Sequence, residues 1–228
     1  MYFIGDCHGK VEKLLRIIHQ FPKEAQFFQL GDMGLGFRGV FLPHIDNLKF
    51  IRGNHDSPQQ CQAHPCYAGE FGYDADTGIF WIGGAWSIDA AYRVEGVSWW
   101  RDEELSQEQL EAAIELYIKV KPKLVVSHEA PSEAAKTLLN AAIVGNPGGE
   151  QAYFGAKFGC VDTRTSKALQ RMFDTHKPDQ WIFGHYHFDK TFELEGCQFT
   201  CLAELSVKEV STCDSAKGVA RGQLEQQS

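Results

Sequence analysis

Long apolar runs are missing from this chain of 228 residues. No stretch of about 18 apolar residues occurs, so we expect no membrane span. The N-terminus lacks a basic region followed by a long apolar one, so we expect no secretory signal and a cytoplasmic location. Positive charge is also scarce, because 22 Lys and Arg face 30 Asp and Glu, a net charge of −8. This balance argues against duplex nucleic acid as a partner, since duplex binding relies on Lys and Arg.

Cysteine usage argues against a disulfide framework. The chain has seven cysteines, an odd number, and no expected export signal, which favours reduced thiols. Cys61 and Cys66 flank His64. We do not expect a structural zinc ion there.

The chain does contain short apolar runs that end in polar residues. The first run, residues 2–4, is followed by Gly5-Asp6-Cys7-His8-Gly9, which predicts a strand, a tight turn and a helix. Residues two apart in an extended turn point the same way, so Asp6 and His8 face one point and Cys7 points away. That point lies beyond the carboxyl end of the strand, where open α/β sheets hold their ligands. One carboxylate and one imidazole form half of a transition-metal site.

Four later apolar runs end in the same manner. Residues 27–30 precede Gly31-Asp32, residues 48–51 precede Arg52-Gly53-Asn54-His55-Asp56, residues 124–126 precede Ser127-His128-Glu129, and residues 181–183 precede Gly184-His185-Tyr186-His187. A glycine in front of the polar residue permits a close approach of the backbone. Each ending alone is compatible with a helix cap, a turn or a buried histidine. The series as a whole indicates a metal site.

Periodicity and turn residues indicate the remaining organisation. We expect helices over 11–20, 106–119, 132–144 and 163–176, a further strand over 79–82, a hairpin of 191–194 with 198–202, and a surface loop over 59–78. No repeat or linker is visible. We therefore expect one domain over 1–214, followed by a polar tail over 215–228 whose composition is typical of disorder.

The order and spacing of these endings resemble the calcineurin-like metallophosphoesterase superfamily, in particular its small phage and bacterial members. The resemblance covers nearly the whole chain, from Gly5 to His187. It implies an α/β fold, a four-layer α/β/β/α sandwich of two mixed sheets flanked by helices. By position it assigns one metal to Asp6, His8 and His187, the other to Asn54, His128 and His185, a bridging role to Asp32, and a place opposite the leaving group to His55.

The residue chemistry agrees with that assignment. Imidazole and carboxylate together suit Mn, Fe, Zn or Ni better than Mg or Ca. We expect two divalent transition-metal ions, with Mn as the first choice. Two ions held about 3.5–4 Å apart clamp the attacking and leaving oxygens of an in-line displacement. A hydroxide bridging them is the expected nucleophile, so no activated Ser or Cys is needed.

One part of the family pattern is missing. In protein phosphatases and dinucleotide tetraphosphatases the second motif continues into Asp-Arg-Gly, which orients the motif histidine and grips phosphate. Here Leu35 stands at the position of that Asp. Arg52 and Arg93 are the alternative phosphate-binding candidates, because a guanidinium binds two oxygens at once, although each could form only a surface salt bridge. Trp86, Trp99 and Trp100 fit either an aromatic wall for the leaving group or the core.

The sequence thus predicts a metal-dependent phosphoester hydrolase acting on a phosphodiester or a phosphomonoester, with a phosphorylated small molecule or nucleotide as the substrate. A serine/threonine protein phosphatase or a dinucleotide polyphosphate hydrolase is the alternative within this class. A non-catalytic scaffold is the alternative from another class, but such members lose metal ligands, and here every ligand position is filled.

Overall fold

The computed structural model describes residues 1–145 and 162–211. Its strands are β1 (Tyr2–Ile4), β2 (Phe27–Gln29), β3 (Leu48–Phe50), β4 (Phe71–Asp74), β5 (Ile79–Ile82), β6 (Leu124–Ser127), β7 (Gln180–Phe183), β8 (Lys190–Leu194), β9 (Cys197–Cys201) and β10 (Val207–Glu209). Its helices are α1 (Val11–Ile18), α2 (Pro58–Gln62), α3 (Gln107–Val120), α4 (Ser132–Gly145) and α6 (Arg164–Thr175), with a 3-10 turn η1 (Ala90–Tyr92).

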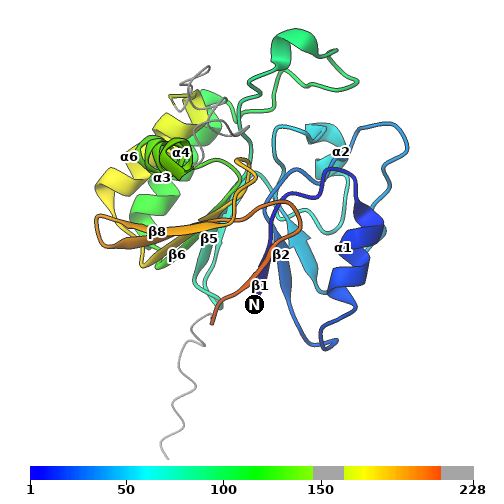
Figure 1. Ribbon diagram of the computed structural model, residues 1–228, viewed down its shortest axis with the longest axis horizontal. Helices are drawn as coiled ribbons and strands as arrows, with labels where there is room; N and C mark the ends of the chain where they lie inside the picture. The colour runs from blue at the N-terminus through cyan, green and yellow to red at the C-terminus, as the bar shows by residue number, and fades with distance from the viewer. Residues whose placement is uncertain (146–161, 212–228) are drawn as a thin grey trace, which may run out of the picture.

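Two sheets form the middle of the molecule. A four-stranded sheet has the order β10-β1-β2-β3, and a six-stranded sheet has the order β4-β5-β6-β7-β9-β8. Both are mixed, because β10, β4 and β8 run antiparallel to their neighbours while the other pairs are parallel. Helices α3, α4 and α6 cover one outer face, and α1 and α2 cover the other (Figure 1). The predicted four-layer sandwich is confirmed.

Side-chain alternation along the short strands holds the two sheets together. Phe3 on β1 and Phe28 on β2 are paired in register and face the other sheet. There they pack with Val126 and Ile182 of the six-stranded sheet. Their neighbours Ile4 and Phe27 point the opposite way, into the layer under α1. Each strand is therefore buried on both faces, which explains why the sequence shows continuous apolar runs at these places.

The predicted helices form, and α3 and α6 begin with side-chain caps. Helix α3 begins with a capping box in which the Ser106 and Gln109 side chains each accept a hydrogen bond from the other's backbone N–H. Helix α6 begins where Thr163 Oγ1 accepts from the N–H of Ser166. The apolar stripe of α1, with Val11, Leu14 and Ile18, is buried against the four-stranded sheet.

The prediction of a surface loop over 59–78 is wrong, because this segment contains most of α2 and all of β4. Helix α2 has a Ser57 cap and Pro58 at its first position, which are helix-start signals. Strand β4 is an edge strand antiparallel to β5, and a Cβ on Gly72 would come 2.4 Å from the Trp81 ring. The apolar pattern of β4 is weak because it lies at an edge, packing only partly buried side chains.

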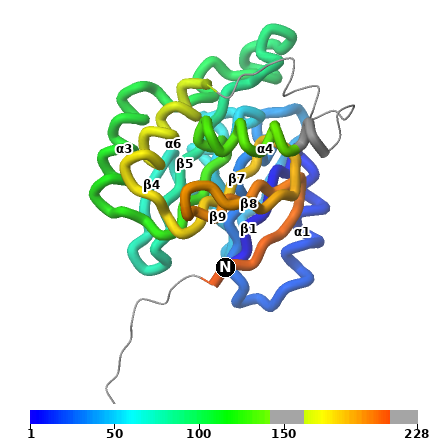
Figure 2. Tube along the Cα trace, turned by 60° about the vertical axis from the view of Figure 1, so that its left-hand side comes forward, coloured from blue at the N-terminus to red at the C-terminus, as the bar shows by residue number. Residues whose placement is uncertain are grey.

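The two ends of the described chain meet. Strand β10, which the sequence did not indicate, lies beside β1 near the N-terminus (Figure 2), and the Met1 amino group donates to the Val210 carbonyl at 3.1 Å. The tail expected over 215–228 lies outside the described residues. Within residues 1–145 and 162–211, no helix combines the length and apolar character needed to cross a bilayer. The described cysteines are all free and buried.

Candidate metal centre

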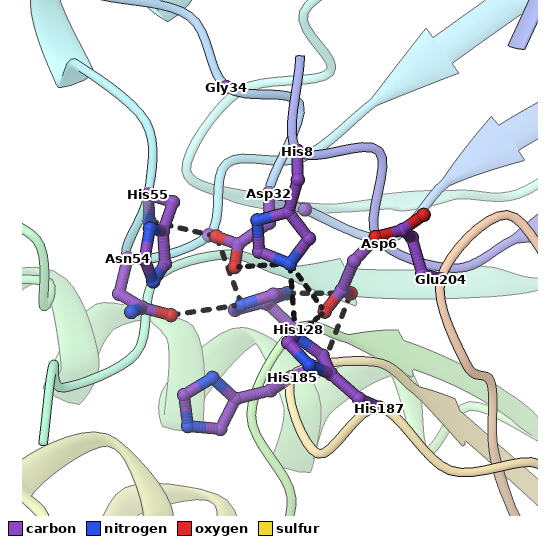
Figure 3. A network of polar contacts seen from close by, with 12 residues as sticks. Asp6, His8, Asp32, Gly34, Asn54, His55, His128, His185, His187 and Glu204 are labelled. Atoms are coloured by element: carbon purple, nitrogen blue, oxygen red, sulfur yellow. Dashed lines mark hydrogen bonds and ion pairs between the residues drawn. The ribbon is translucent and has the colours of Figure 1, made fainter. Parts of the chain in front are cut away.

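The polar endings of five strands converge at one place. Three of these strands, β1, β2 and β3, run parallel in the four-stranded sheet, and the other two, β6 and β7, run parallel in the six-stranded sheet. Their carboxyl ends therefore meet at the same edge of the sandwich. The side chains that follow these strands point toward one another there (Figure 3). The convergence expected from the apolar runs is therefore present in the structure.

One half of the cluster consists of Asp6, His8 and His187, whose potential ligand atoms all lie within 4.8 Å of one another. Asp6 Oδ2 lies 3.2 Å from His187 Nε2 and 3.7 Å from His8 Nε2. The same oxygen is buried and receives no hydrogen bond. The two Nε2 atoms of His8 and His187 are only 2.9 Å apart. A bare carboxylate oxygen facing two imidazole nitrogens is the arrangement that a cation would satisfy.

The other half centres on Asp32 and His128, both buried. His128 Nδ1 donates to the Leu30 carbonyl at 2.7 Å, which directs Nε2 toward Asp32 Oδ1 at 3.3 Å and Asn54 Oδ1 at 3.2 Å. The second Asp32 oxygen, Oδ2, lies 3.9 Å from His8 Nε2. Asp32 is thus placed between the two halves, as a bridging ligand must be.

His185 enters the site differently from the other predicted ligands. Its ring lies beside that of His128, with centroids 5.1 Å apart. Its Nε2 faces Glu129 Oε2 at 3.6 Å, which leaves Nδ1 for a metal. Metal-bound histidines commonly donate their other ring N–H to a carboxylate or a carbonyl, and His185 and His128 both have such a partner. Burial lowers the pKa of His185, which favours the neutral form of this ring.

The backbone at these ligands is strained in a shared way. Non-glycine residues rarely have positive φ, yet four predicted ligands do; they are His8 (47°), Asp32 (48°), His185 (68°) and His187 (56°). Glycines in these motifs permit close approach, as the sequence indicated. A Cβ on Gly53 would come 2.0 Å from Asp32 Oδ1, and one on Gly184 would come 2.3 Å from Asp6 Oδ1. Such strain collects at functional sites, where the surrounding structure enforces it.

The charge of the cluster favours a bound cation. Burial lowers the pKa of His128, but the adjacent Asp32 and Asp6 carboxylates outweigh it and raise the pKa to about 10. For Asp6, burial raises the pKa, but contacts with His187 and His8 outweigh burial. The pKa of Asp6 therefore lies below its ordinary value. The carboxylates are thus strongly stabilised as anions, and His128 takes up a proton at the place where its lone pair meets two oxygens. A divalent ion fits that position and the donor set.

His55 lies at the edge of the cluster, and its backbone N–H donates to Asp32 Oδ1 at 2.8 Å. Phe37 stacks on one side of its ring, with centroids 6.1 Å apart and planes at 18°. The Arg93 guanidinium lies 3.1 Å from Nδ1 and 3.2 Å from Nε2. Burial, followed by the positive charge of Arg93, lowers the pKa of His55 to about 4. Phe37 and Arg93 therefore hold the imidazole in the absence of the family's Asp.

The two candidate phosphate-binding arginines have different environments. Arg93 donates to Asp89 Oδ1 at 2.6 Å and to the Ser98 carbonyl at 3.1 Å, and its side chain reaches the site beside His55. Arg52 is 2% exposed, and its guanidinium donates to Glu70 at 2.7 Å and to the Glu103 carbonyl. The structure commits Arg52 to these internal partners and places no predicted ligand among its contacts.

Asp56 holds the backbone of residues 33–35, the loop after Asp32, in place. It is fully buried and accepts hydrogen bonds from the N–H groups of Met33, Gly34 and Leu35 and from that of Gly53. The Leu35 side chain, at the position of the family's Asp, is buried in the apolar layer under α1. Asp56 thereby ties the loop after β2 to the loop after β3.

Other residues singled out by the sequence lie around the site. Cys7 is buried in the layer under α1, away from Asp6 and His8, and burial raises its pKa to about 12. Trp100 is 9% exposed and packs edge-on against Phe37, so it is part of the core beneath His55. Trp86 and Trp99 are partly buried. The described groups that could hold a metal do not include Cys61 or Cys66.

Sequence reasoning missed two residues that lie behind the Asn54 side chain. Ser87 and Glu103 are buried and connect to the Asn54 amide through hydrogen bonds. Ser87 lies in the glycine-rich stretch after β5, which is distinctive in the sequence, but Glu103 stands among acidic residues with no local signal. A buried Glu is a functional or structural signal only once its burial is known.

Comparison with protein families agrees with this geometry. The model of the calcineurin-like phosphoesterase family matches residues 1–189, a range that contains all the predicted ligands and His55. A comparison with curated protein sequences finds no significant match. The match spans most of the chain and ends just after the last predicted ligand. The chain therefore belongs to the calcineurin-like phosphoesterase family, whose members hydrolyse phosphoesters with the help of bound metal.

Proposed function

We propose that this protein hydrolyses a phosphodiester or phosphomonoester of a small molecule or nucleotide at a dinuclear metal centre. The observation that carries the proposal is the position of Asp32, whose two oxygens face His128 at 3.3 Å and His8 at 3.9 Å, on the two halves of one cluster. Asp6, His8 and His187 would hold one ion, and Asn54, His128 and His185 the other. When bound, two such ions supply a hydroxide nucleophile at neutral pH and neutralise phosphate charge.

The chain's own residues then prepare the site. Asp6 and Asp32 place negative charge where cations bind, and their burial strengthens that attraction because the local dielectric is low. The carbonyl of Leu30 and the carboxylate of Glu129 fix the ring orientations of His128 and His185. These contacts lie within the chain itself, so the fold sets the ring orientations that a metal site needs.

His55 and Arg93 are the residues that we assign to the substrate. The low pKa of His55 leaves it neutral at pH 7, so its single ring N–H can donate a hydrogen bond to the leaving oxygen. Only one of its ring nitrogens can accept from Arg93 at a time. The Arg93 guanidinium, fixed by Asp89 at 2.6 Å, is then placed to bind a phosphate oxygen beside the imidazole.

A panel of phosphomonoesters, phosphodiesters, cyclic phosphodiesters and dinucleotide polyphosphates, assayed with added Mn²⁺, tests the proposal. We expect turnover of a monoester or a diester that is lost on chelation. Asp32→Asn should remove nearly all of it, because that change weakens both metal positions together. Asp46→Asn, at a carboxylate that is 96% exposed, is the matched control and should leave turnover unchanged. Absence of turnover on every substrate at full metal loading would instead favour a scaffold.

A further inference from the structure

The Asn54 amide can bind a metal in only one of its two orientations. Its amide has an oxygen at one end and an NH₂ group at the other, and only the oxygen can bind a metal. In the structure Asn54 Nδ2 donates to Ser87 Oγ at 3.0 Å, while Oδ1 lies 3.2 Å from His128 Nε2. Asn54 is 4% exposed and Ser87 is 1% exposed, so water does not compete for these groups.

Glu103 fixes the direction of this hydrogen bond. The Ser87 N–H donates to Glu103 Oε1 at 2.7 Å, and Ser87 Oγ donates to Oε2. A hydroxyl has one hydrogen to give and an ionised carboxylate can only accept. Because Ser87 gives its hydrogen to Glu103, its oxygen can only accept from Asn54. The NH₂ end of Asn54 must therefore face Ser87, and the oxygen must face the cluster.

The rest of the chain holds Glu103 rigidly. It is 2% exposed, its N–H donates to the Trp100 carbonyl at 3.0 Å, and its own carbonyl accepts from Arg52. A Cβ on Gly84 would come 2.8 Å from that carbonyl, so a glycine is needed for this packing. Arg52 precedes Gly53 and Asn54 in the chain, and it thereby fastens the Glu103 segment to the loop that carries the ligand.

We propose that Ser87 and Glu103 are positioning residues that present the Asn54 oxygen to the second metal. The inference rests on the proposed dinuclear function, because it presumes that Asn54 is a ligand. It predicts a selective effect, since neither residue contacts Asp6, His8 or His187. Loss of an outer-shell partner typically costs about 10–100-fold in metal affinity. We expect that loss at one metal position and no change at the other.

Calorimetric titration of the metal-free chain with Mn²⁺ tests this inference. The wild type should bind two equivalents. Ser87→Ala and Glu103→Gln should each weaken one equivalent about 10–100-fold and leave the other unchanged. Glu103→Gln keeps the shape of the side chain but offers an NH₂ group to Ser87, which turns the hydroxyl hydrogen toward Asn54 and favours the flipped amide. Ser132→Ala, which removes a buried hydroxyl that contacts Ser166, is the control and should keep both affinities.

A double-mutant cycle separates positioning from general damage. In an Asn54→Ala background, Ser87→Ala should have no further effect on Mn²⁺ affinity, because its action passes through the Asn54 amide. A further loss there, or unchanged affinities in both single variants, would overturn the inference while leaving the proposed function intact. A wild type that binds fewer than two equivalents would overturn both. Thermal unfolding in chelator, measured for every variant, checks that each one is folded.

Discussion

Removal of the Asp56 carboxylate should strongly destabilise the fold. Asp56 is fully buried and accepts four backbone hydrogen bonds, from Met33 at 3.1 Å, Gly34 at 2.7 Å, Leu35 at 3.0 Å and Gly53 at 2.8 Å. A buried N–H left without a partner costs about 1–3 kcal/mol. Four such groups sum to about 4–12 kcal/mol, which is comparable with the whole stability of a typical domain, about 5–15 kcal/mol.

Two substitutions grade this effect. Asp56→Ala empties the position and should lose at least about 4 kcal/mol or fail to fold. Asp56→Asn keeps one oxygen as an acceptor but turns an NH₂ group toward the two remaining N–H donors, so we expect a loss of about 2–6 kcal/mol. Both loops that carry Asp32 and Asn54 depend on these bonds, so the surviving variant should also bind metal more weakly.

Urea denaturation at pH 8 in the presence of chelator is the appropriate assay. Burial and the nearby Asp32 raise the pKa of Asp56 to about 6, so at pH 8 the carboxylate is ionised and its four acceptor bonds are intact. Chelation removes the stabilisation that bound metal would add. Asp46→Asn, an exposed carboxylate, should stay within about 0.5 kcal/mol of wild type. A loss below about 1 kcal/mol for Asp56→Asn would refute the reasoning, because each unpaired N–H alone should cost that much.

Two further predictions concern the site itself. Cys7→Ser should keep full metal content by elemental analysis, because Cys7 points into the layer under α1; loss of one metal equivalent would contradict this placement. His55→Ala should slow turnover about 10²–10³-fold for a substrate with a poor leaving group, because it removes the hydrogen bond from the neutral ring to the leaving oxygen, and less for a nitrophenolate, which delocalises the developing charge. An equal loss for both leaving groups, measured at full metal occupancy, would show that His55 only orders its loop and does not interact with the leaving oxygen.

The sequence predicted where the candidate ligands lie on the strands, because those positions follow from short-range geometry. Asp6 and His8 face one point because they are two residues apart, and every apolar run that introduces a ligand proved to be a strand. The convergence of both sheets at one edge came with the family resemblance. Ser57 and Pro58 are local helix-start signals for α2, and they contradict the loop predicted over 59–78.

What the sequence could not show depends on long-range packing. Arg52 stands next to Gly53, which made it a candidate for phosphate, but its partners Glu70 and Glu103 lie far along the chain and bury it. Phe37 and Arg93 replace the missing Asp beside His55 through contacts that no spacing rule encodes. The left-handed backbone at His8 likewise depends on the surrounding fold, because a residue other than glycine adopts it only uncommonly.

A crystal structure of the protein grown with Mn²⁺, with anomalous scattering used to locate the ions, tests the central claim most directly. The account predicts two anomalous peaks about 3.5–4 Å apart, with Asp32 contacting both, Asp6, His8 and His187 at one, and Asn54, His128 and His185 at the other. A single peak, or a pair in which Asp32 touches only one ion, would contradict the dinuclear centre on which the proposed function stands.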